Sequence, residues 1–229
     1  MIECPVCTTR NGDLSVVCSK CGGYLQARVQ TLDLFDTLWA LTESPKKTFK
    51  RICLSEQKNY IHFLAAVSGI GVGFTWLWRV HGGWFFENNL QLLILTGILA
   101  GPVIGIILLY LVSFFYFCFA RLMKGAGRFR DAKAVLAYAM VPLMLATIFI
   151  LPLELGFFGI YFFTANPSPM ILKPVAYIVL ISLDGLSVLW SFILLVIGTR
   201  VLFAKGRITS IVLSLCALAV IGSFFFGIP

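Results

Sequence analysis

Charged side chains are scarce in this sequence. Only 12% of its 229 residues are charged, while 59% are apolar. A soluble domain carries about 25% charged residues, so this composition excludes an ordinary soluble domain and indicates a membrane protein. The length allows no more than a handful of spans at about 20 residues each.

Other features are missing as well. The first residues, MIECPVCTTRNGD, lack the basic flank, apolar run and cleavage site of a signal peptide, so we expect the encoded N-terminus to be retained. The only histidines, His62 and His81, have no acidic or cysteine neighbours at ligand spacing. No serine, cysteine or carboxylate constellation suggests a nucleophile with its base, so the sequence makes no case for an enzyme.

The cysteines, in contrast, do form a pattern, because four of the seven lie within the first 21 residues. Cys4-Pro-Val-Cys7 is followed by Cys18-Ser-Lys-Cys21, and two such knuckles can present four thiolates to one tetrahedral zinc ion. The alternative is two structural disulfides, which require an oxidising compartment. The remaining three have no spacing pattern and are interpreted as free thiols: Cys53, Cys118 and Cys216.

A four-cysteine site has no open position, so the predicted zinc is structural. Its binding would supply most of the folding energy of so short a segment, about 10–16 kcal/mol in comparable peptides. Only Arg10 and Lys20 are basic inside the module, which disfavours nucleic acid as a partner and favours a protein contact or simple capping of the chain.

Five long apolar runs follow, and they do not alternate as barrel strands would, so we expect transmembrane helices. The chain after Pro152 should leave the third of these helices. Glu154 should then lie near the outer interface, where it would be a poor partner for Asp184 in the fourth span. The predicted spans are residues 60–78, 90–120, 132–163, 174–203 and 208–228.

The basic residues predict the orientation. Sixteen of the eighteen Lys and Arg fall before the first span, or in the loops between spans two and three and between spans four and five together with the span ends that border those loops. Only Arg79 and Lys173 fall on the other side. The positive-inside rule therefore predicts a cytosolic N-terminus and an external C-terminus in a plasma (inner) membrane.

The segment before the first span is predicted to be an amphipathic helix. Leu32, Phe35 and Trp39 share one side, and Asp33 and Asp36 take the other. It would lie on the inner leaflet or, alternatively, dock a cytosolic partner. Four basic residues that follow would meet anionic headgroups: Lys46, Lys47, Lys50 and Arg51.

Asp184 is the most informative polar residue within a span. Ser187 and Ser191 follow at i+3 and i+7, which predicts one polar stripe facing other helices. The stripe could be a proton, ion or substrate site, or it could only form hydrogen bonds between helices.

Glycines recur every fourth residue at Gly97, Gly101 and Gly105, and again at Gly69 and Gly73. Such faces allow close helix contact, either within the bundle or in a homodimer.

Three short motifs carry a family resemblance. They are TESPKKTFKRI at residues 42–52, KGAGRFRDA at 124–132 and LAYAMVP at 136–142. In this order they resemble the bacterial branch of the Yip family, the Ypt/Rab-interacting proteins with a five-pass domain. Members similar to this chain often carry an N-terminal zinc ribbon, which the CPVC and CSKC pairs would supply.

The resemblance implies a membrane scaffold rather than an enzyme. Eukaryotic members bind prenylated Rab-type GTPases, but their Asp-Leu-Tyr-Gly-Pro element is absent here, so GTPase binding does not carry over.

The sequence thus predicts an all-α polytopic membrane protein, a five-transmembrane-helix bundle with a small N-terminal zinc ribbon. The expected parts are a ribbon (1–27), a juxtamembrane segment (28–59) and a membrane domain (60–229). The leading hypothesis is a non-enzymatic scaffold or adaptor that engages the bilayer, protein partners and a second copy of itself. The alternative is a small-solute or ion transporter that uses Asp184.

Overall fold

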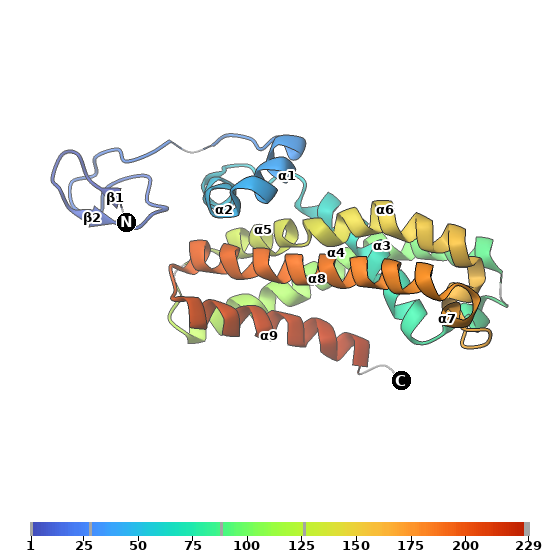
Figure 1. Ribbon diagram of the computed structural model, residues 1–229. Helices are drawn as coiled ribbons and strands as arrows, with labels where there is room; N and C mark the ends of the chain where they lie inside the picture. The colour runs from blue at the N-terminus through green and yellow to red at the C-terminus, as the bar shows by residue number, and fades with distance from the viewer. Residues whose placement is uncertain (1, 28, 88, 126, 227–229) are drawn as a thin grey trace. The chain divides into compact units, whose positions relative to one another are not determined.

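The computed structural model describes residues 2–27, 29–87, 89–125 and 127–226, with residues 224–226 described by their backbone alone. Arg28, Ala126 and the predicted end of the last span at 228 lie outside this part. The chain divides into two compact units, Met1–Asn59 and Tyr60–Pro229, which are described separately (Figure 1).

The first unit begins with a small hairpin and continues into two short helices. Strands β1 (Ile2–Glu3) and β2 (Arg10–Asn11) pair antiparallel. Helix α1 (Leu34–Glu43) is followed directly by α2 (Pro45–Leu54), with a proline in the first turn of α2, where its missing N–H costs no helical hydrogen bond.

Helix α1 is shorter than the predicted amphipathic segment, because Asp33 caps it by accepting a hydrogen bond from the Asp36 N–H. Leu32 therefore lies before the helix and is buried, with 2% of its surface exposed. Phe35 and Trp39 are 80% and 69% exposed. The expectation that these three form one apolar line is wrong, because the helix turns a different face inward.

That buried face holds the two helices together. Thr37 and Leu41 of α1 are buried, as are Phe49 and Ile52 of α2. The Thr48 hydroxyl of α2 donates to a carbonyl oxygen of α1 at 2.9 Å. Phe35 and Trp39 remain available for a membrane surface or a partner.

The second unit is entirely helical in its described part. Its longer helices are α3 (Ile61–Arg79), α4 (Leu90–Leu122), α5 (Phe129–Ala139), α6 (Val141–Phe158), α8 (Pro174–Phe203) and α9 (Arg207–Phe226). Its short ones are η1 (Gly82–Phe86), η2 (Gly159–Phe163) and α7 (Pro169–Leu172).

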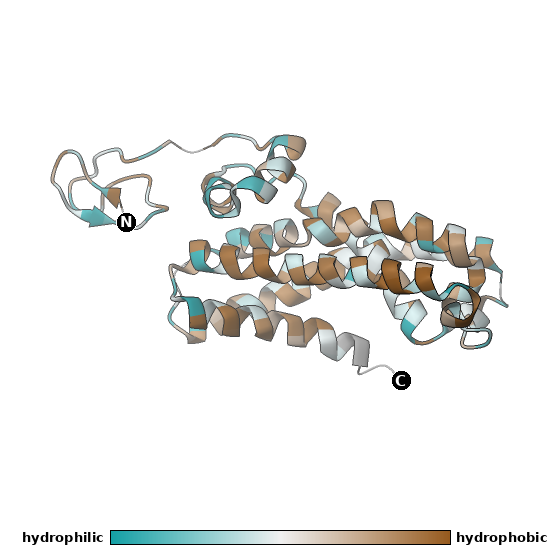
Figure 2. Cartoon of the chain, viewed as in Figure 1, coloured by the Kyte–Doolittle hydropathy of each residue, from teal (hydrophilic) through white to brown (hydrophobic). Residues whose placement is uncertain are grey.

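Four segments are long and apolar enough to cross a membrane: α3, α4, the run Phe129–Phe163 and α8. Helix α9 adds a shorter apolar one, so the predicted helical membrane fold is confirmed. In α8 only 22% of the most apolar window is buried. Exposed side chains such as Leu99 (66%) on α4 leave the helices apolar on their outer faces, as Figure 2 shows. Lipid is the solvent that suits such a surface.

The third apolar run is broken where the sequence places proline. Helix α5 ends at Ala139 and α6 begins at Val141, because Pro142 has no N–H to donate to the Tyr138 carbonyl four residues earlier and its ring would clash with that carbonyl in a continuous helix. Helix α6 then continues through Pro152 to Phe158, so the expected exit at Pro152 is wrong. The chain leaves the helix at Gly159, whose φ of +54° suits glycine.

Helices α3 and α4 make the closest approach in the bundle. A Cβ added to Gly69 would lie 2.3 Å from the carbonyl oxygen of Gly101, and one added to Gly105 would lie 2.0 Å from that of Ala65. Glycine is required at these crossings because the backbones themselves touch. Gly73, one turn further along, faces open space.

Helix α9 is held by polar groups in the interior. The Tyr116 hydroxyl of α4 lies 2.7 Å from the Thr199 hydroxyl of α8, which lies 3.3 Å from the Ser214 hydroxyl of α9. All three side chains are buried. They connect three helices through hydrogen bonds that lipid cannot replace.

The two ends of the bundle differ in charge. The α4–α5 and α8–α9 connections lie at one end, and the connections that contain η1, η2 and α7 lie at the other. In the described part of this unit, Arg79 and Lys173 are the cations at the η1/η2 end.

Candidate metal centre and intramembrane sites

The four N-terminal cysteines converge on one point. Their sulfur atoms all lie within 4.8 Å of one another. Sγ of Cys4 lies 3.5 Å from that of Cys21, and Sγ of Cys7 lies 3.5 Å from that of Cys18. The sulfurs of a tetrahedral site with Zn–S bonds of about 2.3 Å are about 3.8 Å apart, so the cluster has the dimensions of such a site.

The two knuckles share one backbone pattern. The N–H of Thr8 donates to the Cys4 carbonyl, and the N–H of Gly22 donates to the Cys18 carbonyl, at 2.9 and 3.0 Å. Thr8 and Gly22 both adopt left-handed backbone, with φ of +56° and +70°. The sequence reveals this need at Gly22, but the threonine conceals it at Thr8.

Asn11 connects the two knuckles and is a functional residue that the sequence reasoning missed. Its side chain is buried, donates to the Thr9 carbonyl at 2.8 Å and accepts from the Ser19 N–H at 3.0 Å. Its Nδ2 also lies 3.5 Å from Sγ of Cys18. An asparagine between two cysteine pairs gives no sequence signal by itself, because its role depends on the fold.

The environment of the thiols favours thiolate at one position. Hydrogen bonds from the backbone N–H groups of Cys21 and Lys20 lower the pKa of Cys18 to about 6. At Cys21 the Gly23 N–H lowers the pKa, but the neighbouring thiols of Cys7 and Cys4 outweigh it and raise the pKa to about 12. Four crowded thiols without a cation therefore compete for negative charge, which a divalent metal would relieve.

The donor set and the spacing fit a metal, and the four cysteines could bind one. All seven cysteines are free thiols, and the 3.5 Å contacts between sulfurs are far longer than the roughly 2.05 Å of a disulfide bond. The geometry thus favours the metal alternative over two disulfides.

Asp184 has an intramembrane partner that the sequence reasoning rejected. Glu154 of α6 is only 3% exposed, and its carboxyl group interacts directly with that of Asp184 on α8. Oε1 of Glu154 has no hydrogen-bond partner among the described residues. The expectation that Glu154 is a poor partner for Asp184 is wrong, because α6 continues beyond Pro152 and packs along α8.

The serines of the predicted stripe do not join this pair through hydrogen bonds. The Ser187 hydroxyl donates to the carbonyl of Leu183 in its own helix, at 3.0 Å. Ser191 is buried, with a hydroxyl that lacks a partner in the described part of the chain. The structure therefore brings Asp184 together with Glu154 rather than with the serines.

The structure also places the predicted glycines and basic residues. Gly97 faces the Phe74 ring, while Gly101 and Gly105 meet the backbone of α3. Lys46 and Lys47 are exposed on α2, Lys50 is half-buried, and Arg51 forms an ion pair with Asp36 at 2.5 Å.

These features define a multi-pass helical membrane protein with an N-terminal four-cysteine cluster. Comparison with known families agrees, since the Yip1 domain model matches residues 39–227. The chain therefore belongs to the Yip1 domain family, whose members are generally non-enzymatic membrane proteins. No curated protein and no solved structure matches it.

Proposed function

We propose that this Yip1-domain protein is a membrane adaptor whose zinc-bound ribbon docks a protein partner in the cytosol. The observation that carries the proposal is the outer surface of the ribbon. Val6, Val17 and Tyr24 are 74%, 56% and 63% exposed, while Cys4 and Cys18 are buried at 1% and 3%. The ribbon thus turns two of its four metal ligands, Cys4 and Cys18, inward and large apolar side chains outward.

Two of these apolar residues form a pair that a partner could cover. Val17 and Tyr24 lie opposite each other in an antiparallel bridge, so their side chains are neighbours. Exposed tyrosine next to an aliphatic side chain is typical of the centre of a protein interface. The sequence of the ribbon (1–27) contains two basic residues, Arg10 and Lys20, which supports a protein rather than a nucleic acid as the partner.

Crosslinking mass spectrometry in native membranes tests the proposal. The wild-type ribbon should yield crosslinks to one or a few defined proteins, and Tyr24→Asp should remove them while zinc remains bound. Lys20→Ala is the matched control, because it changes an exposed ribbon residue outside the apolar pair and should preserve the crosslinks. Crosslinks that persist in Tyr24→Asp and also in Cys4→Ser/Cys7→Ser would refute the adaptor role.

The place of the adaptor is part of the same proposal. We infer zinc as the metal from the four-thiolate donor set, and a bacterial inner membrane from the family resemblance. The charge distribution supports a cytosolic ribbon and an external C-terminus. We further propose that Phe35 and Trp39 rest in the inner leaflet, with Lys46 and Lys47 near its headgroups.

A second candidate function has its own observation. The buried contact between Glu154 and Asp184 supplies the second deep ionisable group that a proton or cation path usually contains. In this alternative the chain is a small transporter, and the carboxyl pair holds the moving ion between α6 and α8.

Flux measurements in proteoliposomes distinguish the two functions. A transporter should lose proton or cation flux in Asp184→Asn and in Glu154→Gln, while Ser187→Ala, whose hydroxyl bonds only within its helix, should keep it. If wild-type protein shows no flux above empty liposomes for protons, sodium or potassium, the transporter alternative fails and the adaptor proposal is unaffected.

A further inference from the structure

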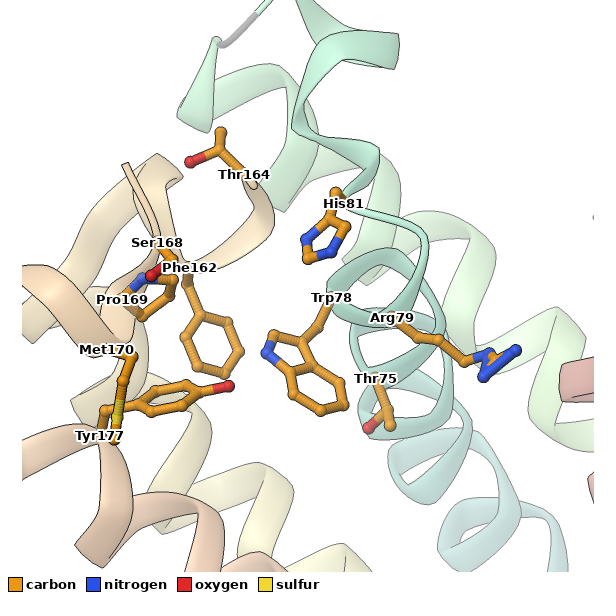
Figure 3. Close-up of a pocket in the computed structure, with 10 residues that line it drawn as sticks. All are labelled: Thr75, Trp78, Arg79, His81, Phe162, Thr164, Ser168, Pro169, Met170 and Tyr177. Atoms are coloured by element: carbon orange, nitrogen blue, oxygen red, sulfur yellow. The ribbon is translucent and has the colours of Figure 1, made fainter. Parts of the chain in front are cut away.

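A cavity of about 550 Å³ opens at the η1/η2 end of the bundle. Its walls come from the end of α3, from η2, from the loop that leads to α7 and from the start of α8 (Figure 3). The aromatic rings of Trp78, Phe162 and Tyr177 form most of the interior. Trp78 stacks on Phe162 with ring centres 6.4 Å apart, and Phe162 meets Tyr177 edge-on at 6.5 Å.

The cavity is apolar in body, yet several polar groups face it without partners. Figure 3 shows the indole nitrogen of Trp78 and the hydroxyl of Tyr177 directed toward the interior, with the imidazole of His81 above them. None of these three side chains has a hydrogen-bond partner among the described residues. An indole N–H can only donate a hydrogen bond. The three groups are therefore suited to a ligand that supplies acceptor oxygens.

The side chains around the cavity would not repel an anion. Arg79 and His81 are among the ten described lining residues, and none of the ten is acidic. The guanidinium of Arg79 points away from the interior in Figure 3, so it contributes positive potential at the rim rather than a direct contact.

The level of the cavity in the membrane specifies the ligand further. Helix α3 ends at Arg79 and α8 begins at Pro174, so the cavity lies where spanning helices enter the headgroup region. Tryptophan and tyrosine are typical of this boundary, because each ring has an apolar body and a polar tip. A phospholipid at this level has its acyl chains on the membrane side of the boundary and its phosphate oxygens on the water side.

We propose that this cavity binds one phospholipid from the leaflet at the η1/η2 end. Its phosphate accepts hydrogen bonds from Trp78, Tyr177 and His81, and the first part of an acyl chain lies against Phe162 and Met170. The site is separate from the ribbon and from the carboxyl pair, so it adds a lipid-recognition function at the opposite end of the bundle from the α4–α5 and α8–α9 loops.

Native mass spectrometry of the full chain in detergent tests the site with three probes. These are dioleoyl-phosphatidylglycerol, dioleoylglycerol without phosphate, and glycerol phosphate without acyl chains. The phospholipid should bind at one copy per chain, at least tenfold more tightly than either fragment. Equal binding of dioleoylglycerol would overturn the role of the phosphate, and equal binding of glycerol phosphate would indicate a soluble anion as the ligand.

Variants that keep an aromatic ring at each position but remove the N–H or O–H test the donors. Trp78→Phe and Tyr177→Phe should each weaken phospholipid binding about tenfold, because each removes one hydrogen bond to a charged group. The matched controls are Trp190→Phe and Tyr161→Phe, which lie outside the cavity and should bind as the wild type does.

A third variant covers the case in which the ring changes prevent folding. His81→Gly suits the left-handed backbone at φ +50°, lies in an exposed turn and leaves no side-chain donor, so it should fold and still weaken binding. Unchanged phospholipid affinity in all three folded variants, or in His81→Gly when the other two do not fold, would overturn the proposal.

Discussion

At the scale of single residues, the ribbon depends on a few atoms around four sulfurs. The Asn11 amide and the backbone N–H of Lys20 both reach Sγ of Cys18, while Cys21 lies at the exposed edge of the cluster. Cys18 is therefore a buried ligand and the most readily ionised of the four, so its loss should weaken metal binding most strongly.

Cys18→Ser should abolish stoichiometric zinc binding and unfold the ribbon. Metal binding supplies about 10–16 kcal/mol in comparable modules, which a core this small cannot replace. Elemental analysis of purified protein should find one zinc per wild-type chain and well below half in Cys18→Ser. Cys53→Ser, a change outside the cluster, should keep its zinc, and one full zinc per chain in Cys18→Ser would mean that the metal is not held by the cluster.

Zinc affinity should fall as the pH falls. With a pKa of about 12 in the metal-free ribbon, Cys21 is protonated at neutral pH, so binding must release its proton. Below about pH 6, Cys18 is protonated as well. Each such thiol should raise the zinc Kd about tenfold per pH unit of acidification. Chelator competition between pH 5 and pH 8 measures this slope, and a flat profile would contradict thiolate ligation.

At the scale of helices, backbone contact fixes α3 against α4. Gly105→Val should destabilise the bundle by about 1–3 kcal/mol, because its side chain would collide with the carbonyl of Ala65. Gly73→Val is the matched control, since it faces open space on the same helix pair. Thermal unfolding in detergent should separate the two variants. Equal midpoints would show that the glycine face is not used inside the bundle.

The buried hydroxyl chain makes a second prediction at this scale. Tyr116→Phe should cost about 0.6–1.7 kcal/mol, because it removes the 2.7 Å hydrogen bond that joins α4 to α8. Protease accessibility of α9 should rise in parallel, because the Thr199–Ser214 contact between α8 and α9 then loses its link to α4. Tyr161→Phe, whose exposed hydroxyl makes no hydrogen bond in the described part, should leave both readouts unchanged.

The helices themselves could be predicted well, and their contacts only in part. Apolar length alone located α3, α4 and α8 closely, because lipid forces long apolar runs into helices. The behaviour at Pro152 was not predictable, since a proline ends a helix in water but is accommodated between neighbouring membrane helices. That one error moved Glu154 away from Asp184 and concealed the carboxyl pair.

The metal centre shows the same division between local and long-range information. Spacing in the sequence is enough to identify the four ligands, because each knuckle is a local turn: Cys4, Cys7, Cys18 and Cys21. Asn11 and the aromatic cavity near Trp78 depend on segments that meet only in the fold. The prediction of an apolar line through Leu32 is wrong for a related reason. Periodicity does not show which residue a capping aspartate will exclude from the helix.

At the scale of the whole molecule, the adaptor proposal depends on an odd number of membrane crossings. The family match covers residues 39–227, so the ribbon precedes a shared membrane domain. If α9 crosses the membrane as α3, α4, the Phe129–Phe163 run and α8 do, the two ends of the chain face opposite compartments. In the proposed orientation the basic loops and the ribbon share the cytosolic side, and the phospholipid cavity faces the other.

Paired topology reporters test this arrangement most directly. One reporter before Met1 and one after Pro229, each read by a cytosolic and by an external assay, should report opposite sides, with the ribbon in the cytosol. Two reporters on the same side would contradict the five-crossing account, and a ribbon outside the cytosol would contradict the adaptor.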